Sequence, residues 1–479
     1  MKFKIEILLC LIVFLLSLTC VSAETFENES VTGLQSFNSD FVVEDILTQT
    51  YENYTSVSAG TFDDLQAEIN KAPAGSVLIL NRDYNGAYGS RIQLNKNLII
   101  DGQGHTLDCM HEECSAFYSS SGTITLKNLK IINGHNDYNY NGGAIHIEGS
   151  AEYTIENCVF KDNWADDNGG AIYNDVEKTL RLINCTFISN EVNDGDGGAV
   201  WSAGILNVDS CTFDKNTADN FGGAIYASTE MESLYGYEHS INIINSIFTS
   251  NSANDKSGGA VYSNGGVHVH NSIFRDNVAD DKGGAICHNL VINAVVVDNS
   301  TFIGNQAYYG GAIDSYSLAK IDNSTFIGNY AESDGGAVKA ELVEIEPFSK
   351  SQSFFIDNKA GRDGGAVYGR PYIYNTVFIR NTAAHGGALY NLHHMTVGYC
   401  LFENNKATGS SLWDGLGGAI CAHNGDVHVY SCTFKDNYAA DYGGAIYGAT
   451  IWVNDNQDDN QPYNTFFIHN TVGDNNGGA

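Results

Sequence analysis

The sequence predicts an all-β protein folded as a right-handed parallel β-helix, a solenoid of about 14 coils with a helical cap at its N-terminal end. Two interleaved motifs support this prediction. The tripeptide Gly-Gly-Ala occurs thirteen times from residue 142 onward, with a mean spacing of about 28 residues. One Phe-x-x-Asn motif lies between each successive pair of copies, which gives twelve in all. A repeat of this length is typical of solenoids, and parallel crossover connections are almost always right-handed.

The first 23 residues have the build of a secretory signal peptide. Lys2 and Lys4 precede an apolar run from Ile7 to Val21, and the segment closes on the small residues Ser22 and Ala23. This arrangement predicts cleavage after Ala23. The alternative is an uncleaved membrane anchor, although the run is short for a span of about 20 residues. Because no second long apolar run follows, we expect a chain with no membrane span after cleavage.

The next two segments lead into the repeats. Residues 24–60 are polar with little periodicity, which is typical of a linker. Residues 61–141 are predicted to hold the N-terminal cap and the first coils. They open on a Thr-Phe-Asp-Asp helix start, and Phe62, Leu65 and Ile69 then share one helical face until a proline ends the helix. Such a helix would cover the first coil, as solenoids require.

Residues 142–479 contain the repeats, and each unit is predicted to form three short strands. Apolar residues lie seven and five positions before Phe, as Leu180 and Leu182 do before Phe187, so they share one face of a strand. The next inward residue lies two positions before Phe, which is three residues after the previous inward one instead of two. The alternation therefore slips by one residue, and a corner must lie between the positions five and two before Phe. Asn suits this corner because it tolerates the left-handed conformation. It stands there in eight of twelve units: Asn157, Asn184, Asn245, Asn271, Asn299, Asn323, Asn375 and Asn464.

Stacked coils would place equivalent residues above one another, about 4.8 Å apart, with Phe on Phe and Asn on Asn inside the coil. An up-and-down propeller is the structural rival, but its blades need about 40 residues and antiparallel hairpins. The longer gaps between motifs, at residues 230–238, 409–415 and 455–463, are predicted to be loops. Because the sequence stops within a repeat, we expect it to be a fragment of a longer chain.

The charge balance excludes one class of partner. The chain has 24 Lys and Arg residues against 57 Asp and Glu residues, a formal net charge of −33. Contact with phosphate requires a basic surface, so nucleic acid is excluded as a partner. An acidic surface of this kind favours solvation or divalent cations.

The paired motifs also resemble those of a known group of proteins. The alternation of Gly-Gly-Ala-Ile and Phe-x-x-Asn resembles the repeat of the chlamydial polymorphic outer-membrane proteins. Together with the segment Ile99–Leu107, it is similar to the adhesin-like, pectin-lyase-like β-helix proteins of methanogenic archaea. The similarity covers about residues 61–479. It implies a secreted or surface-exposed adhesin-like protein with the right-handed fold.

Aromatic residues form one candidate binding surface. The residue that follows Gly-Gly-Ala-Ile, or its Val or Leu form, is aromatic in seven of the twelve complete copies and points outward by strand alternation. We expect an exposed stripe that suits extracellular glycans or proteins. The alternative is ladder stacking that stiffens the coils. The seven residues are Tyr173, Trp201, Tyr226, Tyr262, Tyr368, Tyr390 and Tyr447.

Acidic residues in the turns before Gly-Gly form a second candidate site. Calcium prefers carboxylate oxygens, although the nine-residue Gly-Asp calcium repeat is not present. The favoured interpretation is a solvated face with no cofactor, and calcium is the alternative. The candidate ligands are Asp166, Asp167, Asp194, Asp196, Asp280 and Asp281.

Nine cysteines remain after removal of the predicted signal. Five of them occupy the position two before Phe, which they share with Ser and Thr, so that position requires a small side chain. We therefore expect structural thiols there. Cys109 and Cys114 lie outside this ladder and could form a disulfide in a secreted protein.

The sequence therefore predicts a non-enzymatic adhesin-like protein of the cell surface or extracellular space, which binds cells, glycans or matrix. A polysaccharide lyase or glycoside hydrolase on the same fold is the alternative. Acidic residues recur once per coil, whereas a catalytic site is normally singular. An enzyme would gather carboxylates with Arg or Lys in one cleft.

Overall fold

The structure, a computed structural model, describes residues 58–136, 141–228, 239–291, 293–345, 351–391, 393–409, 415–453 and 464–473. The chain divides into two units, Met1–Ser56 and Val57–Ala479, and all described residues belong to the second. The predicted signal peptide, nearly all of the predicted linker and the predicted loops at 230–238 and 455–463 lie outside the described residues. So does most of the loop at 409–415.

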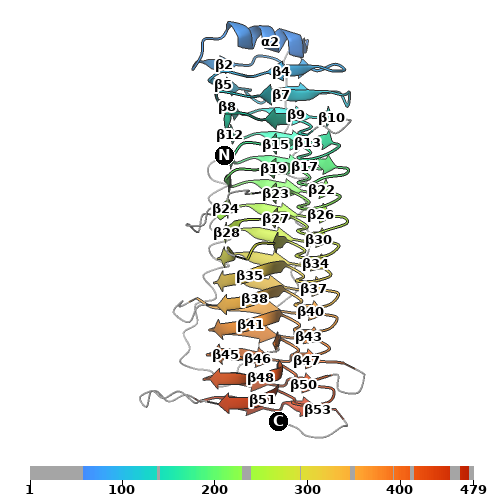
Figure 1. Cartoon of the computed structure of the whole chain (residues 1–479), viewed down its shortest axis with the longest axis vertical. Helices are drawn as coiled ribbons and strands as arrows, with labels where there is room; N and C mark the ends of the chain where they lie inside the picture. The colour runs from blue at the N-terminus through green and yellow to red at the C-terminus, as the bar shows by residue number, and fades with distance from the viewer. Residues whose placement is uncertain are drawn as a thin grey trace, which may run out of the picture. The chain divides into compact units, whose positions relative to one another are not determined.

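The helix α2 (Phe62–Lys71) covers the first coils, as predicted (Figure 1). Thr61 and Asp64 form a capping box, in which each side chain accepts a hydrogen bond from the backbone N–H of the other residue. The apolar face is buried through Phe62, Leu65 and Ile69. The helix therefore closes the core at this end of the stack.

Over the residues that the structure describes, the coils below it form three parallel sheets, each running along the stack (Figure 1). The sixteen-stranded phenylalanine sheet contains β1 (Gly60–Thr61), β3 (Tyr84–Asn85), β6 (Thr106–Asp108), β9 (Lys130–Ile132), β13 (Val159–Lys161), β17 (Thr186–Ile188), β21 (Thr212–Asp214), β25 (Ile247–Thr249), β29 (Ile273–Arg275), β33 (Thr301–Ile303), β36 (Thr325–Ile327), β39 (Ser353–Ile356), β42 (Thr376–Ile379), β46 (Leu401–Glu403), β49 (Thr433–Lys435) and β52 (Phe466–Ile468). The thirteen-stranded alanine sheet contains β10 (His135–Asn136), β14 (Trp164–Ala165), β18 (Glu191–Val192), β22 (Thr217–Ala218), β26 (Ser252–Ala253), β30 (Val278–Ala279), β34 (Gln306–Ala307), β37 (Tyr330–Ala331), β40 (Lys359–Ala360), β43 (Thr382–Ala383), β47 (Lys406–Ala407), β50 (Tyr438–Ala439) and β53 (Thr471–Val472).

The third sheet, the wide sheet, has twenty-four strands. It contains β2 (Val77–Ile79), β4 (Arg91–Gln93), β5 (Leu98–Asp101), β7 (Ser115–Ser119), β8 (Thr123–Lys127), β11 (Ile145–Ile147), β12 (Glu152–Glu156), β15 (Ile172–Asn174), β16 (Leu180–Ile183), β19 (Val200–Ser202), β20 (Leu206–Asp209), β23 (Ile225–Ala227), β24 (His239–Ile244), β27 (Val261–Ser263), β28 (Gly266–His270), β31 (Ile286–His288), β32 (Ala294–Asp298), β35 (Ile313–Asp322), β38 (Val338–Ile345), β41 (Val367–Tyr374), β44 (Leu389–Asn391), β45 (Met395–Gly398), β48 (Ile420–Tyr430) and β51 (Ile446–Val453).

One coil passes through all three sheets in turn. The coil of β15 runs on through β16 in the wide sheet, then β17 in the phenylalanine sheet and β18 in the alanine sheet. The predicted three-strand unit is thus resolved into four segments in three sheets. The reason is that the Gly-Gly-Ala segment and the following apolar segment share the wide sheet, and β35 pairs with both β31 and β32.

Seven of the eight predicted Asn corners have the left-handed backbone conformation, and no φ angle tests Asn464. Positive φ angles of 42–53° occur at Asn157, Asn184, Asn245, Asn271, Asn299, Asn323 and Asn375. A second corner lies two residues after each Phe, for example at Asp162 and Ser189, with φ of 54° and 51°. The predicted slip in alternation thus corresponds to the Asn corner, where the chain bends from the wide sheet into the phenylalanine sheet.

The core consists of stacked identical side chains. Successive phenylalanines from Phe160 to Phe467 stack with ring centroids 4.6–5.1 Å apart and interplanar angles of 2–16°. The Asn of each motif forms a buried amide ladder beside them. Asn216, for example, donates from Nδ2 to Asn251 Oδ1 at 2.9 Å and to the Phe187 carbonyl at 3.1 Å. Each buried amide is thus paired along the stack.

The Gly-Gly pair is required by two separate constraints. Gly197 has a φ of 70°, which disfavours any residue with a Cβ. A Cβ on Gly198 would lie 2.2 Å from the carbonyl oxygen of Gly223 in the next coil. The following Ala199 is fully buried. The motif therefore allows the backbones of adjacent coils to approach closely.

The cysteines are buried free thiols throughout the described residues. In the small-residue ladder, Cys211 Sγ accepts the backbone N–H of Cys185 at 3.3 Å, and Ser246 Oγ accepts that of Cys211 at 3.0 Å. Thiol and hydroxyl thus accept the same kind of backbone hydrogen bond, and the cysteines of this ladder are structural thiols, as predicted. Cys109 and Cys114 also remain thiols, and Cys114 Sγ lies 3.3 Å from Ser90 Oγ.

Candidate binding surfaces

The predicted aromatic residues lie in one line along the wide sheet, which we call the aromatic column. Tyr173 and Trp201 stack with ring centroids 4.7 Å apart. The stack continues through Tyr226 to Tyr262, with centroids 5.9 and 5.3 Å apart. Tyr368 and Tyr390 stack in the same way at 5.5 Å, and Tyr447 holds the equivalent position in β51. This contact pattern is the one expected of ladder stacking.

The aromatic column is less exposed than predicted at two of its positions, because an apolar residue that precedes a Gly-Gly pair folds over it. Phe221 lies against Tyr262, with ring centroids 4.4 Å apart, and Leu416 packs on Tyr390. Tyr262 and Tyr390 are only 5% and 7% exposed, and the other five residues are half-buried. The prediction of an exposed stripe is therefore wrong for Tyr262 and Tyr390.

The candidate calcium ligands are spread over several coils. Asp166 and Asp194 lie in register on adjacent coils. Partial burial of Asp167 raises the pKa of its carboxyl group, and the negative charges of Asp166 and Asp194 raise it further. Asp196 accepts the backbone N–H of Phe221 at 3.2 Å, and burial raises its pKa to about 6. Asp196 thus satisfies a backbone donor of the next turn.

Asp280 and Asp281 lie three coils further along the stack. Asp281 lies 4.0 Å from Lys282 Nζ, and Asp280 is exposed. Within the described ranges, no three Asp, Glu, His or Cys side chains converge as a set that could hold a metal ion. The six predicted carboxylates therefore do not come together as one ligand set.

An ionic cluster interrupts the aromatic column in its middle; it comprises the buried Asp314 and Asp334, the half-buried Lys339 and the exposed Arg362. Arg362 donates two hydrogen bonds to the Asp334 carboxylate, at 2.9 and 2.8 Å. Lys339 Nζ lies 3.7 Å from Asp334 and 3.3 Å from the centre of the Tyr309 ring. Asp334 and Asp314 are only 2% and 8% exposed. The sequence analysis missed this cluster, although the column positions Cys287, Asp314 and Lys339 visibly break the aromatic pattern.

Burial controls the protonation of this cluster. Asp314 lies in register between Cys287 and Lys339. Burial raises the pKa of Asp314 to about 7, although Lys339 and Lys282 oppose the shift. Burial also lowers the pKa of Lys339, against the attraction of Asp314 and Asp334. The cluster therefore contains a carboxyl group that is half protonated near neutral pH.

Asp314→Asn is expected to stabilise the protein at pH 8 by on the order of 3 kcal/mol, and to change little at pH 4. Since the pKa of Asp314 is about 7 in the folded chain and near 3.8 when unfolded, the folded chain binds the extra proton between these values. Stability from this group is therefore lost as pH rises from about 4 through 7. Urea unfolding of both proteins at pH 4, 6 and 8 tests this. Equal differences at all three pH values would contradict it.

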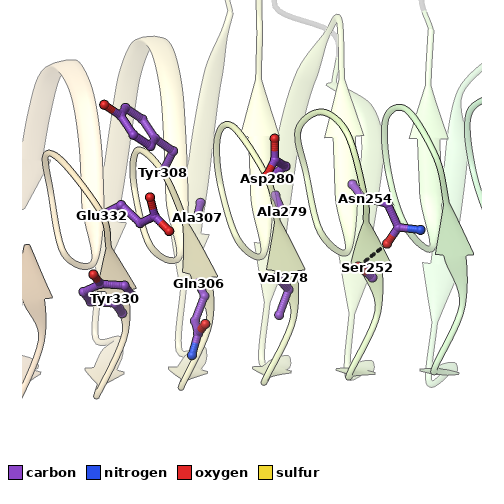
Figure 2. A pocket seen from close by; sticks show the side chains of 11 residues that line it. Ser252, Asn254, Val278, Ala279, Asp280, Gln306, Ala307, Tyr308, Tyr330 and Glu332 are labelled. Carbon is purple, nitrogen blue, oxygen red and sulfur yellow. Dashed lines mark hydrogen bonds between the residues drawn. The ribbon is translucent and has the colours of Figure 1, made fainter.

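A groove runs over the alanine sheet; we call it the alanine groove. Its volume is about 240 Å³, and its floor is formed by Ala253, Ala279 and Ala307, which are 1–4% exposed. Figure 2 shows two rows of longer side chains on either side of the alanines. One row contains Ser252, Val278, Gln306 and Tyr330, and the other contains Asn254, Asp280, Tyr308 and Glu332.

The alanine groove exists because alanine is the shortest side chain between two longer neighbours. The x-Ala pairs form two-residue strands, so x and the residue after Ala stand on either side of it. The sequence contained this signal, since most Phe-x-x-Asn motifs continue as x-Ala. In later coils the residue after Ala is small, namely Gly361, Ala384, Thr408 and Ala440. One wall of the groove is therefore lower in those coils.

Comparisons with known proteins agree with this architecture. Residues 114–290 match the family model described as right handed beta helix region. Residues 399–423 and 431–449 match the Chlamydia polymorphic membrane protein repeat. No curated protein and no solved structure matches the chain. Among the described residues, no helix has the length and apolar character needed to cross a membrane. The protein is thus a right-handed parallel β-helix with repeats like those of the Chlamydia polymorphic membrane proteins.

Proposed function

We propose that the chain is an adhesin-like protein of the cell surface or extracellular space, a β-helical scaffold that binds cells, glycans or matrix. The observation that carries this proposal is the match of residues 399–423 and 431–449 to a repeat described from Chlamydia polymorphic membrane proteins. The partners we propose are cell-surface or extracellular glycans or proteins.

The division between inward and outward positions supports this role. Inside the coils, Phe and Asn recur in every repeat, and their contacts hold the stack together. Outside, the aligned positions of the alanine sheet carry unlike residues, such as Ser252, Val278, Gln306 and Tyr330. A rigid stack with variable outer positions is typical of solenoids that present binding surfaces.

Binding of the purified full chain to whole cells and to a glycan array tests the proposed function. We expect saturable binding to at least one cell type or glycan, and the same chain denatured in urea as a control should not bind. Absence of binding to every cell type and every glycan would contradict an adhesive role. The high negative charge makes nonspecific attraction to anionic surfaces unfavourable, so charge attraction to such surfaces would not explain binding.

The second candidate is a polysaccharide lyase or glycoside hydrolase, and the ionic cluster favours it. Two carboxylates lie beside Lys339 and Arg362 in adjacent coils, and the lowered pKa of Lys339 suits a general base. Asp314 and Asp334 are covered whereas Arg362 is exposed, so a substrate could contact Arg362 but would reach the two carboxylates only after a local movement. A polysaccharide panel tests this candidate. If the chain is such an enzyme, it should release product from at least one polysaccharide, and Lys339→Met should abolish this release. A rate of product release equal to background on every polysaccharide would contradict the candidate.

A further inference from the structure

We propose that the alanine groove binds a chain of neutral sugar residues laid along the axis of the coils. This inference rests on the proposed adhesive function and deepens it, because it assigns both a ligand class and a surface. It also places binding away from the aromatic column, whose rings are already stacked on one another.

The alanine groove presents the same framework on four successive coils. Its strands β26, β30, β34 and β37 pair in parallel register, with Ser252 opposite Val278, and Gln306 opposite both Val278 and Tyr330. Adjacent coils lie about 4.8 Å apart, which is close to the length of one pyranose ring in an extended chain. A polysaccharide can therefore place about one sugar on each coil.

The side chains that line the alanine groove match the needs of sugar hydroxyl groups. Ser252, Asn254 and Gln306 offer both donors and acceptors, and Asp280 and Glu332 offer acceptors. The Ser252 hydroxyl already donates to Asn254 Oδ1 at 2.9 Å (Figure 2). No Lys, Arg or His is among the lining residues, and Lys359 lies beside Tyr330 at one end of the groove. An acidic sugar laid along the groove would therefore be repelled by Asp280 and Glu332. The ligand is therefore neutral.

Two tyrosines provide apolar surface at one end of the alanine groove. Tyr308 is 43% exposed and is held edge-on against Tyr309, with ring centroids 4.6 Å apart and an interplanar angle of 84°. Tyr330 has Lys359 Nζ 5.6 Å from its ring centre. Both rings are thus supported by a neighbour while they line the groove. The C–H face of a sugar packs well on such a ring.

The spacing favours a sugar chain over a basic peptide. Asp280 and Glu332 would attract Lys or Arg side chains. However, side chains on one face of an extended peptide recur about every 6.6 Å, which does not match coils about 4.8 Å apart. A peptide would therefore lose register within two or three coils, whereas a sugar chain would not.

Isothermal titration of the full chain tests the inference, with cellohexaose, xylohexaose and mannohexaose as neutral probes. Hexagalacturonate is the acidic probe and hexalysine the basic peptide. We expect at least one of the three neutral probes to bind. Hexagalacturonate and hexalysine should not bind. Tyr308→Ala and Tyr330→Ala should each weaken this binding by about tenfold.

Matched controls come from tyrosines outside the alanine groove. Tyr438→Ala removes the residue that aligns with Tyr330 four coils further on, and Tyr316→Ala removes a ring that is 60% exposed on the wide sheet. Both should leave binding unchanged. Urea unfolding of each variant verifies that the fold is intact.

The outcomes separate this inference from the proposed function. If the wild-type chain binds cells but no neutral probe, or if hexalysine binds instead, the sugar assignment is wrong and the adhesive role stands. Equal weakening by Tyr438→Ala and Tyr330→Ala would also overturn the assignment. If the chain binds neither cells nor any probe, the proposed function itself fails.

Discussion

Replacing Phe248 with alanine is expected to lower the free energy of unfolding by about 4 kcal/mol. The Phe248 side chain is fully buried, and its ring stacks on Phe213 and on Phe274 with both centroids 4.7 Å away. Truncation removes the buried ring and leaves a cavity that closely spaced backbones cannot fill. It also interrupts the stack on both sides, where each aromatic pair adds about 0.5–1.5 kcal/mol. Urea unfolding followed by circular dichroism measures the loss.

Phe467→Ala is the matched control, because Phe467 belongs to the same ladder in the last described strand of the phenylalanine sheet. It is 42% exposed and stacks on one described neighbour, Phe434, at 5.1 Å. Its loss should cost less than about 2 kcal/mol. Hydrogen exchange should show that Phe248→Ala deprotects the coils next to β25 first, since each coil contacts only its neighbours. Equal costs for the two variants would contradict a ladder-based core.

The repeated inner positions could be predicted from the sequence, because each coil places the same residue types at equivalent inward positions. The apolar alternation before Phe187 and the Asn at position 184 located a strand and its corner, and the structure confirms both. The first Gly of Gly-Gly-Ala recurs because each coil needs a positive φ there, and the second because each coil meets the next at the same backbone distance. The N-terminal helix was predictable for another reason, since its cap and apolar face are local signals.

The outer surfaces were predictable only in part. Alternation correctly placed Tyr262 on the outer side of its strand, but it gave no information on the turn that folds Phe221 over it. The ionic cluster depends on contacts between residues in different coils, such as Asp334 and Arg362, which no single repeat reveals. The alanine groove is formed by strands of two residues, which are too short to show a period. The depth of the groove, the cover over the aromatic column and the pairing of charges thus depend on contacts between coils, which the sequence of a single repeat does not show.

Asn251→Leu is expected to destabilise the protein by at least about 3 kcal/mol, although the two side chains are similar in size. Asn251 is fully buried and makes four hydrogen bonds through its side chain. Its Oδ1 accepts from the backbone N–H and the Nδ2 of Asn216, at 3.0 and 2.9 Å. Its Nδ2 donates to the Phe213 carbonyl and to Asn277 Oδ1, at 3.0 and 2.9 Å. Leucine would remove all four bonds and leave buried partners that water cannot reach.

Asn299→Gly provides the control for Asn251→Leu, because Asn299 belongs to the corner ladder at the surface. Asn299 donates to Asn271 Oδ1 at 3.0 Å in an exposed position and accepts from Asn323 Nδ2 at 3.0 Å in a partly buried one, and its φ is 49°. Glycine keeps this backbone conformation and leaves the former partners accessible to water, so the cost should stay below about 1 kcal/mol. Both variants lose an Asn from a ladder, so the difference between them measures the effect of burial. Equal losses in urea unfolding would show that the inner amides stabilise the stack no more than those at its surface.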